Sequence, residues 1–146
     1  ATRNHWLLVE ALFGEAEDAI DPARPTWVTD FPAALSPLTR PHADDPTLAW
    51  RAELFIGGME LGNFYTELND PDIQRARFTE QLAGINDEEA AFRSLDNDFL
   101  EALLVGMPPA GGFGLGIDRV VMLMTNQTSI RDVILFPLLR PEGVES

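Results

Sequence analysis

Three glycines at alternate positions are the residues with the clearest chemical meaning: Gly112, Gly114 and Gly116. In a strand, residues two apart lie on the same face, so the glycines would leave one face bare while the apolar residues between them cover the other. A flat ligand such as adenine can lie directly on such a backbone. A helix that follows offers N–H groups and the positive end of its dipole to phosphates, and Arg119 on its first turn adds a full charge. The pattern predicts a nucleotide site.

Other glycine motifs fit this segment less well. The dinucleotide fingerprint needs glycine at its sixth position, which counted from Gly112 is Ile117, and no Gly-Lys-Ser/Thr follows as a P-loop requires. A structural interpretation stays open, in which the glycines only keep a strand small for close packing.

Two glutamates on either side of Gly57-Gly58 form the second candidate site. A glycine pair favours a tight two-residue hairpin, in which Glu60 would pair with Phe55. Glu53 would then pair with Gly62, which makes the two glutamates diagonal neighbours on one face. Such neighbours are about 7–8 Å apart, close enough for both carboxylates to reach one Mg²⁺ and bridge nucleotide phosphates. The alternative is that both are solvated charges on an exposed face.

Further along the second strand Asn63, Tyr65 and Glu67 alternate, which places an amide, an aromatic wall and a negative charge on one face. This set suits a ligand with a cationic tip, although ordinary half-buried strand residues would give the same pattern. Strict alternation puts Glu60 on the opposite face from Glu67. We therefore predict a β-bulge near Gly62 if both serve one pocket.

The elements that must position these residues follow in mixed order, which favours an α+β fold with a largely antiparallel sheet. Helical spacing, turn signals and β-branched runs predict a helix over 4–19, a short strand over 26–31, a loop over 36–46 and the hairpin 53–56 with 59–68. They then predict a helix from 71 capped by Asp70, and a helix over 96–105 that packs through Phe99, Leu103 and Leu104. An apolar helical stripe at 117, 120, 121 and 124 follows, and a buried strand is expected at 133–136.

Composition narrows the function classes. The chain has 146 residues, no cysteine and two distant histidines, His5 and His42, so a metal would be held by carboxylate oxygen. The net charge of −14 disfavours general nucleic-acid binding, so any RNA contact must be local. No apolar run approaches the roughly 20 residues of a membrane span, and the N-terminal residues lack the layout of a signal peptide. A cytoplasmic protein is expected.

Five stretches, in order and through almost the whole chain, resemble class II lysyl-tRNA synthetases: 26–39, 55–63 with 66–70, 106–109, 112–119 and 130–137. Aspartyl and asparaginyl relatives share the glycine motif and its arginine. The stretch Glu67-Leu68-Asn69-Asp70 and its hairpin resemble the lysine-specific branch.

The resemblance implies an enzyme of protein biosynthesis that activates lysine with ATP and transfers the lysyl group to tRNA. It implies that Glu53 and Glu60 hold Mg²⁺ on the phosphates, and that Arg119 is catalytic and binds the γ-phosphate end of a bent ATP. By the same resemblance the glycines of the motif, Gly112 included, belong to the ATP site, with Gly114 and Gly116 under adenine. Asn63 would contact the backbone end of lysine, Tyr65 its aliphatic stem and Glu67 its ε-ammonium.

The chain also departs from the family. Phe64 replaces a usually small residue, and on alternation it should alter packing behind the sheet, not the pocket. The family's first two class motifs, which include its dimer-forming elements, and its anticodon-binding domain have no counterpart, so we expect residues 1–146 to be the C-terminal portion of a catalytic domain, inactive alone. The parent is expected to be a homodimer that contacts tRNA(Lys). Two alternatives stay open: a paralogue that transfers a lysine-like group to a protein, and a non-catalytic module that binds nucleotide or lysine.

Overall fold

A computed structural model of the chain describes residues 2–82 and 96–137. Four strands form one sheet in the order β1-β2-β3-β4, and every neighbouring pair is antiparallel. Their bounds are Thr26–Pro32 for β1, Leu48–Ile56 for β2, Met59–Thr66 for β3 and Gly111–Leu115 for β4. The expected α+β class with an antiparallel sheet is confirmed.

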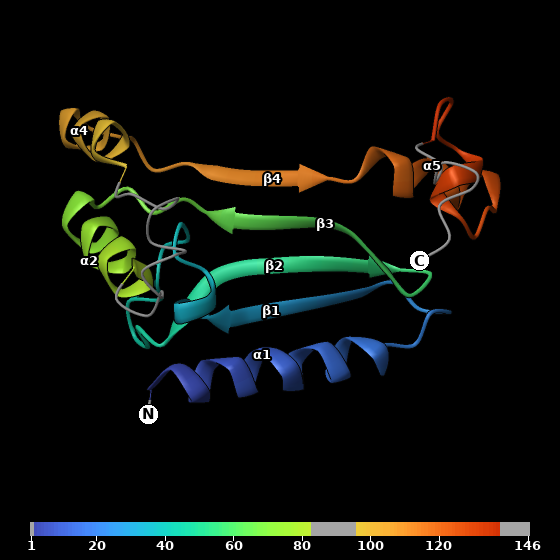
Figure 1. Ribbon diagram of the computed structural model, residues 1–146, viewed down its shortest axis with the longest axis horizontal. Coiled ribbons are helices and arrows are strands. Elements are labelled where there is room, and N and C mark those ends of the chain that lie inside the picture. Colours follow the sequence, from blue (N-terminus) through green and yellow to red (C-terminus); the bar gives the residue numbers. More distant parts are fainter. Residues whose placement is uncertain (1, 83–95, 138–146) are drawn as a thin grey trace, which may run out of the picture.

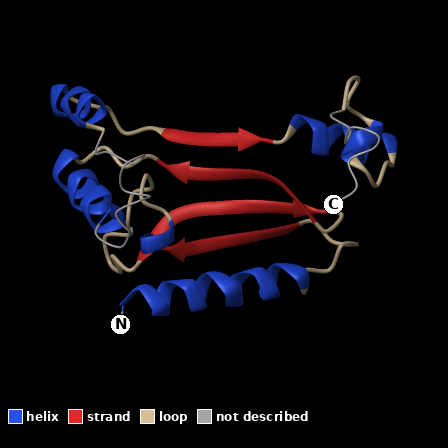
Figure 2. Cartoon of the chain, in the orientation of Figure 1, coloured by secondary structure: helices blue, strands red, loops and turns tan. Residues whose placement is uncertain are grey.

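Helices flank this sheet on one side and at both ends (Figures 1 and 2). The helix α1 (Thr2–Asp18) runs beside β1, α2 (Pro71–Leu82) and α4 (Asn97–Val105) lie together at one end, and α5 (Ile117–Thr125) lies at the other end. Short 3-10 turns cover Ala33–Leu35 and Ile130–Asp132. In the described part of the chain, no helix is both long and apolar enough to cross a membrane.

The hairpin between β2 and β3 contains the predicted bulge. Gly57 and Gly58 have φ values of 65° and 73°, a conformation that favours glycine and closes a two-residue turn. Phe55 pairs with Glu60 as predicted, but Leu54 pairs with Gly62, so Leu61 is an extra residue on β3. The bulge prediction is confirmed.

The bulge also corrects one predicted pair. We expected Glu53 opposite Gly62, whereas Glu53 lies opposite Asn63. The extra residue at Leu61 moves every later residue of β3 by one position relative to β2. Because the pleat has period two, this shift puts Asn63 on the same face as Glu53.

The start of α2 follows the predicted capping: the side chain of Asp70 accepts hydrogen bonds from the backbone N–H groups of Asp72 and Ile73 at 2.9 and 3.0 Å. Asp96, which we expected inside the helix over 96–105, instead caps α4 by accepting from the N–H of Phe99.

The packing face of α4 differs from the prediction. Leu100 and Leu103 are buried, whereas Leu104 is 60% exposed. The prediction that α4 packs through Leu104 was therefore wrong, and Leu100 takes that place.

The two faces of the sheet differ in chemistry. Pairing and alternation put Arg51, Glu53, Phe55, Glu60, Asn63 and Tyr65 on one face, which we call the carboxylate face. The helix α1 lies against part of this face, where the rings of Phe13 and Phe31 meet at 4.9 Å.

An aromatic row crosses the opposite face. The Phe64 ring lies 5.0 Å from Trp27 and 5.8 Å from Phe113, whose side chain is 70% exposed. The prediction that Phe64 points away from Asn63 and alters packing behind the sheet is confirmed.

The strand predicted for the C-terminal segment was wrong. Residues 133–136 form no strand: N–H groups of Val133 and Ile134 both donate to the carbonyl of Ile130 in a local turn, and Leu135 and Phe136 are 88% and 90% exposed. A short apolar run does not by itself provide a strand with a pairing partner. The helix predicted from the stripe at 117, 120, 121 and 124 is confirmed as α5; most of that stripe is exposed, and the buried residue of the helix is Met122.

Candidate active site

Strand pairing gathers the predicted site residues on the carboxylate face. Asn63 of β3 lies between Glu53 of β2 and Gly114 of β4. One step along, Tyr65 lies opposite Gly112. The Glu67 side chain reaches over Gly112, so it too lies on this face. Asn63, Tyr65, Glu67, Gly112 and Gly114 thus form one continuous strip along β3 and β4, with Glu53 beside Asn63 on β2.

Glu53 is a buried acid, 4% exposed. Burial raises the pKa of its carboxyl above the ordinary value, because a charge is poorly solvated inside the protein. The Arg51 guanidinium opposes this by charge and by a hydrogen bond to Oε1, while the nearby charge of Glu60 raises the pKa further. Strand pairing puts the carboxylates of Glu53 and Glu60 on the same face of the sheet.

Arg51 is a site residue that sequence reasoning missed. Its guanidinium pairs with Glu53, lies 4.5 Å from the centre of the Phe31 ring, and donates to the Ser36 hydroxyl at 3.3 Å and to the Leu35 carbonyl at 3.5 Å. Alternation could have found it, since residues 51 and 53 of one strand share a face. The loop that carries Ser36 therefore supports the carboxylate face from the side.

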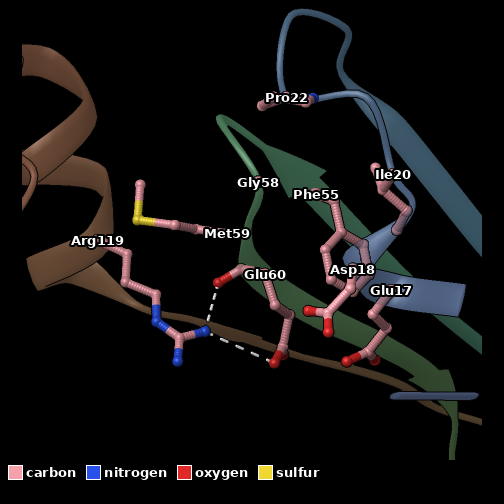
Figure 3. Close-up of a pocket in the computed structure, with 9 residues that line it drawn as sticks. All are labelled: Glu17, Asp18, Ile20, Pro22, Phe55, Gly58, Met59, Glu60 and Arg119. Carbon is pink, nitrogen blue, oxygen red and sulfur yellow. Dashed lines mark hydrogen bonds and ion pairs between the residues drawn. The ribbon is translucent and has the colours of Figure 1, made fainter. Parts of the chain in front are cut away.

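A cavity of 460 Å³ opens beside the hairpin turn and is lined in part by Glu60, Arg119 and the end of α1 (Figure 3). Arg119 donates to the backbone carbonyl of Glu60 at 2.6 Å, and its guanidinium lies 3.6 Å from that residue's carboxylate. Glu17 and Asp18 line the other side. Burial, followed by the charges of Glu53 and Glu60, raises the pKa of the Glu17 carboxyl.

The sequence gives no local signal for Glu17. Its position depends on how α1 packs on the sheet, which is a long-range property. Together with Asp18 and Glu60, Glu17 gives the cavity three acidic side chains, which face the single arginine of its lining, Arg119.

Asn63 offers an unused acceptor. Its Nδ2 donates to Glu60 Oε1 at 3.4 Å, while its buried Oδ1 has no hydrogen-bond partner among residues 2–82 and 96–137. Buried polar atoms are normally paired, so a free acceptor in a candidate site is a natural contact for a ligand donor. A side chain at Gly114 would crowd this atom, since a Cβ there would lie 2.9 Å from Oδ1.

The donor set fits Mg²⁺. No group of three or more histidine, cysteine, aspartate or glutamate side chains placed to hold a metal occurs in the described residues. Mg²⁺ at nucleotide sites needs fewer, because one or two carboxylates hold it together with phosphate oxygens and water. Glu53 and Glu60 provide that number of oxygen ligands.

Comparison with known proteins identifies the family of the chain. A family model described as tRNA synthetases class II (D, K and N) matches residues 14–140. The chain belongs to this family.

Relatives within the family point to its lysine branch. This synthetase chain is 52% identical over 129 residues to the lysine–tRNA ligase of Pelotomaculum thermopropionicum, covering 86% of the chain and 25% of the relative. It is 49% identical over 139 residues to that of Porphyromonas gingivalis, with 94% and 24% covered. It therefore spans about a quarter of the length of these curated relatives.

Proposed function

We propose that this chain supplies the amino-acid and metal side of a lysine–tRNA ligase active site, in which ATP activates lysine as lysyl-adenylate. The observation that carries the proposal is the bulge at Leu61, because it brings Glu60 onto the face of Asn63 and Glu67. Glu53 and Glu60, whose carboxylates suit a phosphate-bound cation, then lie on the same face as Glu67, whose carboxylate suits an ammonium group.

The strip has two ends with different roles. At the cavity end Glu53 and Glu60 would hold Mg²⁺, which when bound neutralises charge on the ATP phosphates. Arg119, on the first turn of α5, contributes positive charge for the terminal phosphates, and the bare backbone at Gly114 and Gly116 accommodates adenine.

At the other end the residues select lysine. Asn63 Oδ1 accepts a hydrogen bond from the amino-acid ammonium, Tyr65 packs on the aliphatic stem, and Glu67 pairs with the ε-ammonium. No protein nucleophile is needed: the lysine carboxylate attacks the α-phosphorus in line, pyrophosphate leaves, and the protein contributes positioning and charge neutralisation. Transfer to tRNA and dimerisation belong to the proposal for the whole ligase.

Calorimetry of the chain with lysine, ATP and Mg²⁺ tests the amino-acid end. A charge-assisted hydrogen bond is worth about 1.5–3 kcal/mol, so Glu67→Gln should weaken lysine binding about 10- to 150-fold. The exposed Glu101 on α4 gives a matched control, and Glu101→Gln should leave binding unchanged. Lysine binding that survives Glu67→Gln unaltered would refute the assignment.

The metal end has an independent test. With Mn²⁺ as a paramagnetic probe in the presence of ATP, Glu60→Gln should weaken binding of the ion while Glu101→Gln should not. Equal Mn²⁺ affinity in all three proteins would remove Glu60 from the metal site.

A further inference from the structure

The first glycine of the motif lies beside the proposed lysine end of the site. Tyr65 pairs with Gly112 and Thr66 with Gly111, while the N–H of Glu67 donates to the Ala110 carbonyl at 2.9 Å. On its other side, Glu67 forms an isolated bridge with Thr39. The backbone of Glu67 is therefore fixed between two neighbours, and only its side chain is free to move.

That side chain occupies the space that a residue larger than glycine would need at 112. A Cβ on Gly112 would overlap Glu67 Oε1, and it would lie 3.1 Å from Glu67 Cδ and 2.9 Å from Tyr65 Cε2. The carboxylate thus lies directly over the β4 backbone, beside the edge of the tyrosine ring.

Gly111 and Gly116 do not share this property, whereas a Cβ on Gly114 would lie 2.9 Å from Asn63 Oδ1, at the other end of the amino-acid pocket. A Cβ on Gly111 would meet only the Tyr65 carbonyl, at 3.7 Å, and one on Gly116 would have Arg119 Cδ and the Leu61 carbonyl as its closest neighbours, at 3.5 Å. Both are ordinary contacts. Close packing of the strand alone does not explain why position 112 is bare, because the atoms it makes room for belong to two side chains of the site.

We propose that Gly112 determines amino-acid specificity, by leaving the space in which the Glu67 carboxylate lies deep enough to meet the end of a lysine side chain. This inference rests on the proposed function and assigns Gly112 to the amino-acid end of the strip. A methyl group at 112 pushes the carboxylate away from β4 into the pocket. The pocket becomes shallower, so an ammonium on a shorter stem loses less than that of lysine.

The fold should tolerate the change, because the two overlapping atoms, Glu67 Oε1 and Tyr65 Cε2, belong to side chains and not to the backbone. Gly112→Ala should therefore leave the urea midpoint close to that of the wild type. Lysine affinity should fall about tenfold or more, whereas affinity for ornithine, one methylene shorter, should fall less, so that the ratio of the two affinities drops about fivefold or more. A residue needed only for packing would lower stability and leave this ratio unchanged.

Calorimetry with lysine and ornithine on four variants tests this. Gly111→Ala is the matched control and should behave as the wild type. Glu67→Asp shortens the acid and should lower lysine affinity, and adding Gly112→Ala to it should cause little further loss, since the overlap has been removed.

Each outcome decides one of the two ideas. No lysine binding by the wild-type chain overturns the proposed function, and the specificity role with it. Lysine binding with an unchanged lysine-to-ornithine ratio in Gly112→Ala, or additive losses in the double variant, overturns the role of Gly112 alone.

Discussion

Gly62 is the position where a single methyl group should disturb the sheet most. It is buried next to the bulge, between β2 and β4. A Cβ there would lie 2.5 Å from the carbonyl oxygen of Gly114 and 3.3 Å from Leu115 Cδ1, whereas ordinary contact begins at 3.4 Å. The overlap with Gly114 is therefore 0.9 Å (3.4 − 2.5), and the atom concerned is backbone and cannot rotate away.

The expected cost follows from this overlap. Forcing an extra methyl group into a packed site costs about 1–3 kcal/mol, and a fixed backbone neighbour places Gly62→Ala in the upper half of that range, at about 2–3 kcal/mol. At about 2–4 °C per kcal/mol for a chain of this size, Tm should fall by about 4–12 °C. Urea unfolding followed by tryptophan fluorescence measures the free energy directly.

A second glycine provides a control of opposite sign. Gly14 lies inside α1 and a Cβ there would meet nothing within 4 Å, so Gly14→Ala should stabilise the chain by up to about 1 kcal/mol through helix propensity. If Gly62→Ala unfolds within about 0.5 kcal/mol of the wild type, the close approach of β3 and β4 inferred at this position is wrong.

Three further predictions concern the two faces of the sheet. Burial raises the pKa of the Glu53 carboxyl, so the protonated acid stabilises the fold below the unfolded-state pKa, and that stabilisation is lost as pH rises through the folded-state pKa. Glu53→Gln should therefore raise Tm at pH 7, and its difference from the wild type should disappear in acid. A lower Tm of Glu53→Gln at pH 7 would contradict this. Arg51→Met should instead cost about 2–3 kcal/mol in urea unfolding, because it leaves the buried Glu53 charge unpaired; a loss below about 0.5 kcal/mol would show that the pair is not formed. Phe64→Ala should cost about 2–4 kcal/mol by the same assay yet leave calorimetric lysine affinity unchanged, since its ring packs between Trp27 and Phe113 on the opposite face; a weakened affinity would place Phe64 in the pocket.

Local rules predicted the elements whose causes are local. The glycine pair specified the hairpin turn, and Asp70 specified the start of α2, because each signal acts within a few residues. The segment 133–136 has strand composition but no strand, because a strand needs a partner that composition does not provide. The position of Glu17 beside the cavity could not be predicted from the sequence either, since it depends on where α1 packs.

The bulge was predictable for a different reason. No residue type near Gly62 indicates a β-bulge. The bulge was inferred because Glu60 and Glu67 could not otherwise lie on the same face of the sheet. Two chemical requirements on one strand, seven residues apart in a structure of period two, demand one extra residue between them. The structure places that residue at Leu61, and every side chain from Asn63 onward takes its face from it. The requirement that Glu60 and Glu67 share a face thus predicted the register of β3 better than strand propensity did. Because of the bulge, Glu53 faces Asn63 and not Gly62, which simple alternation assigned to it.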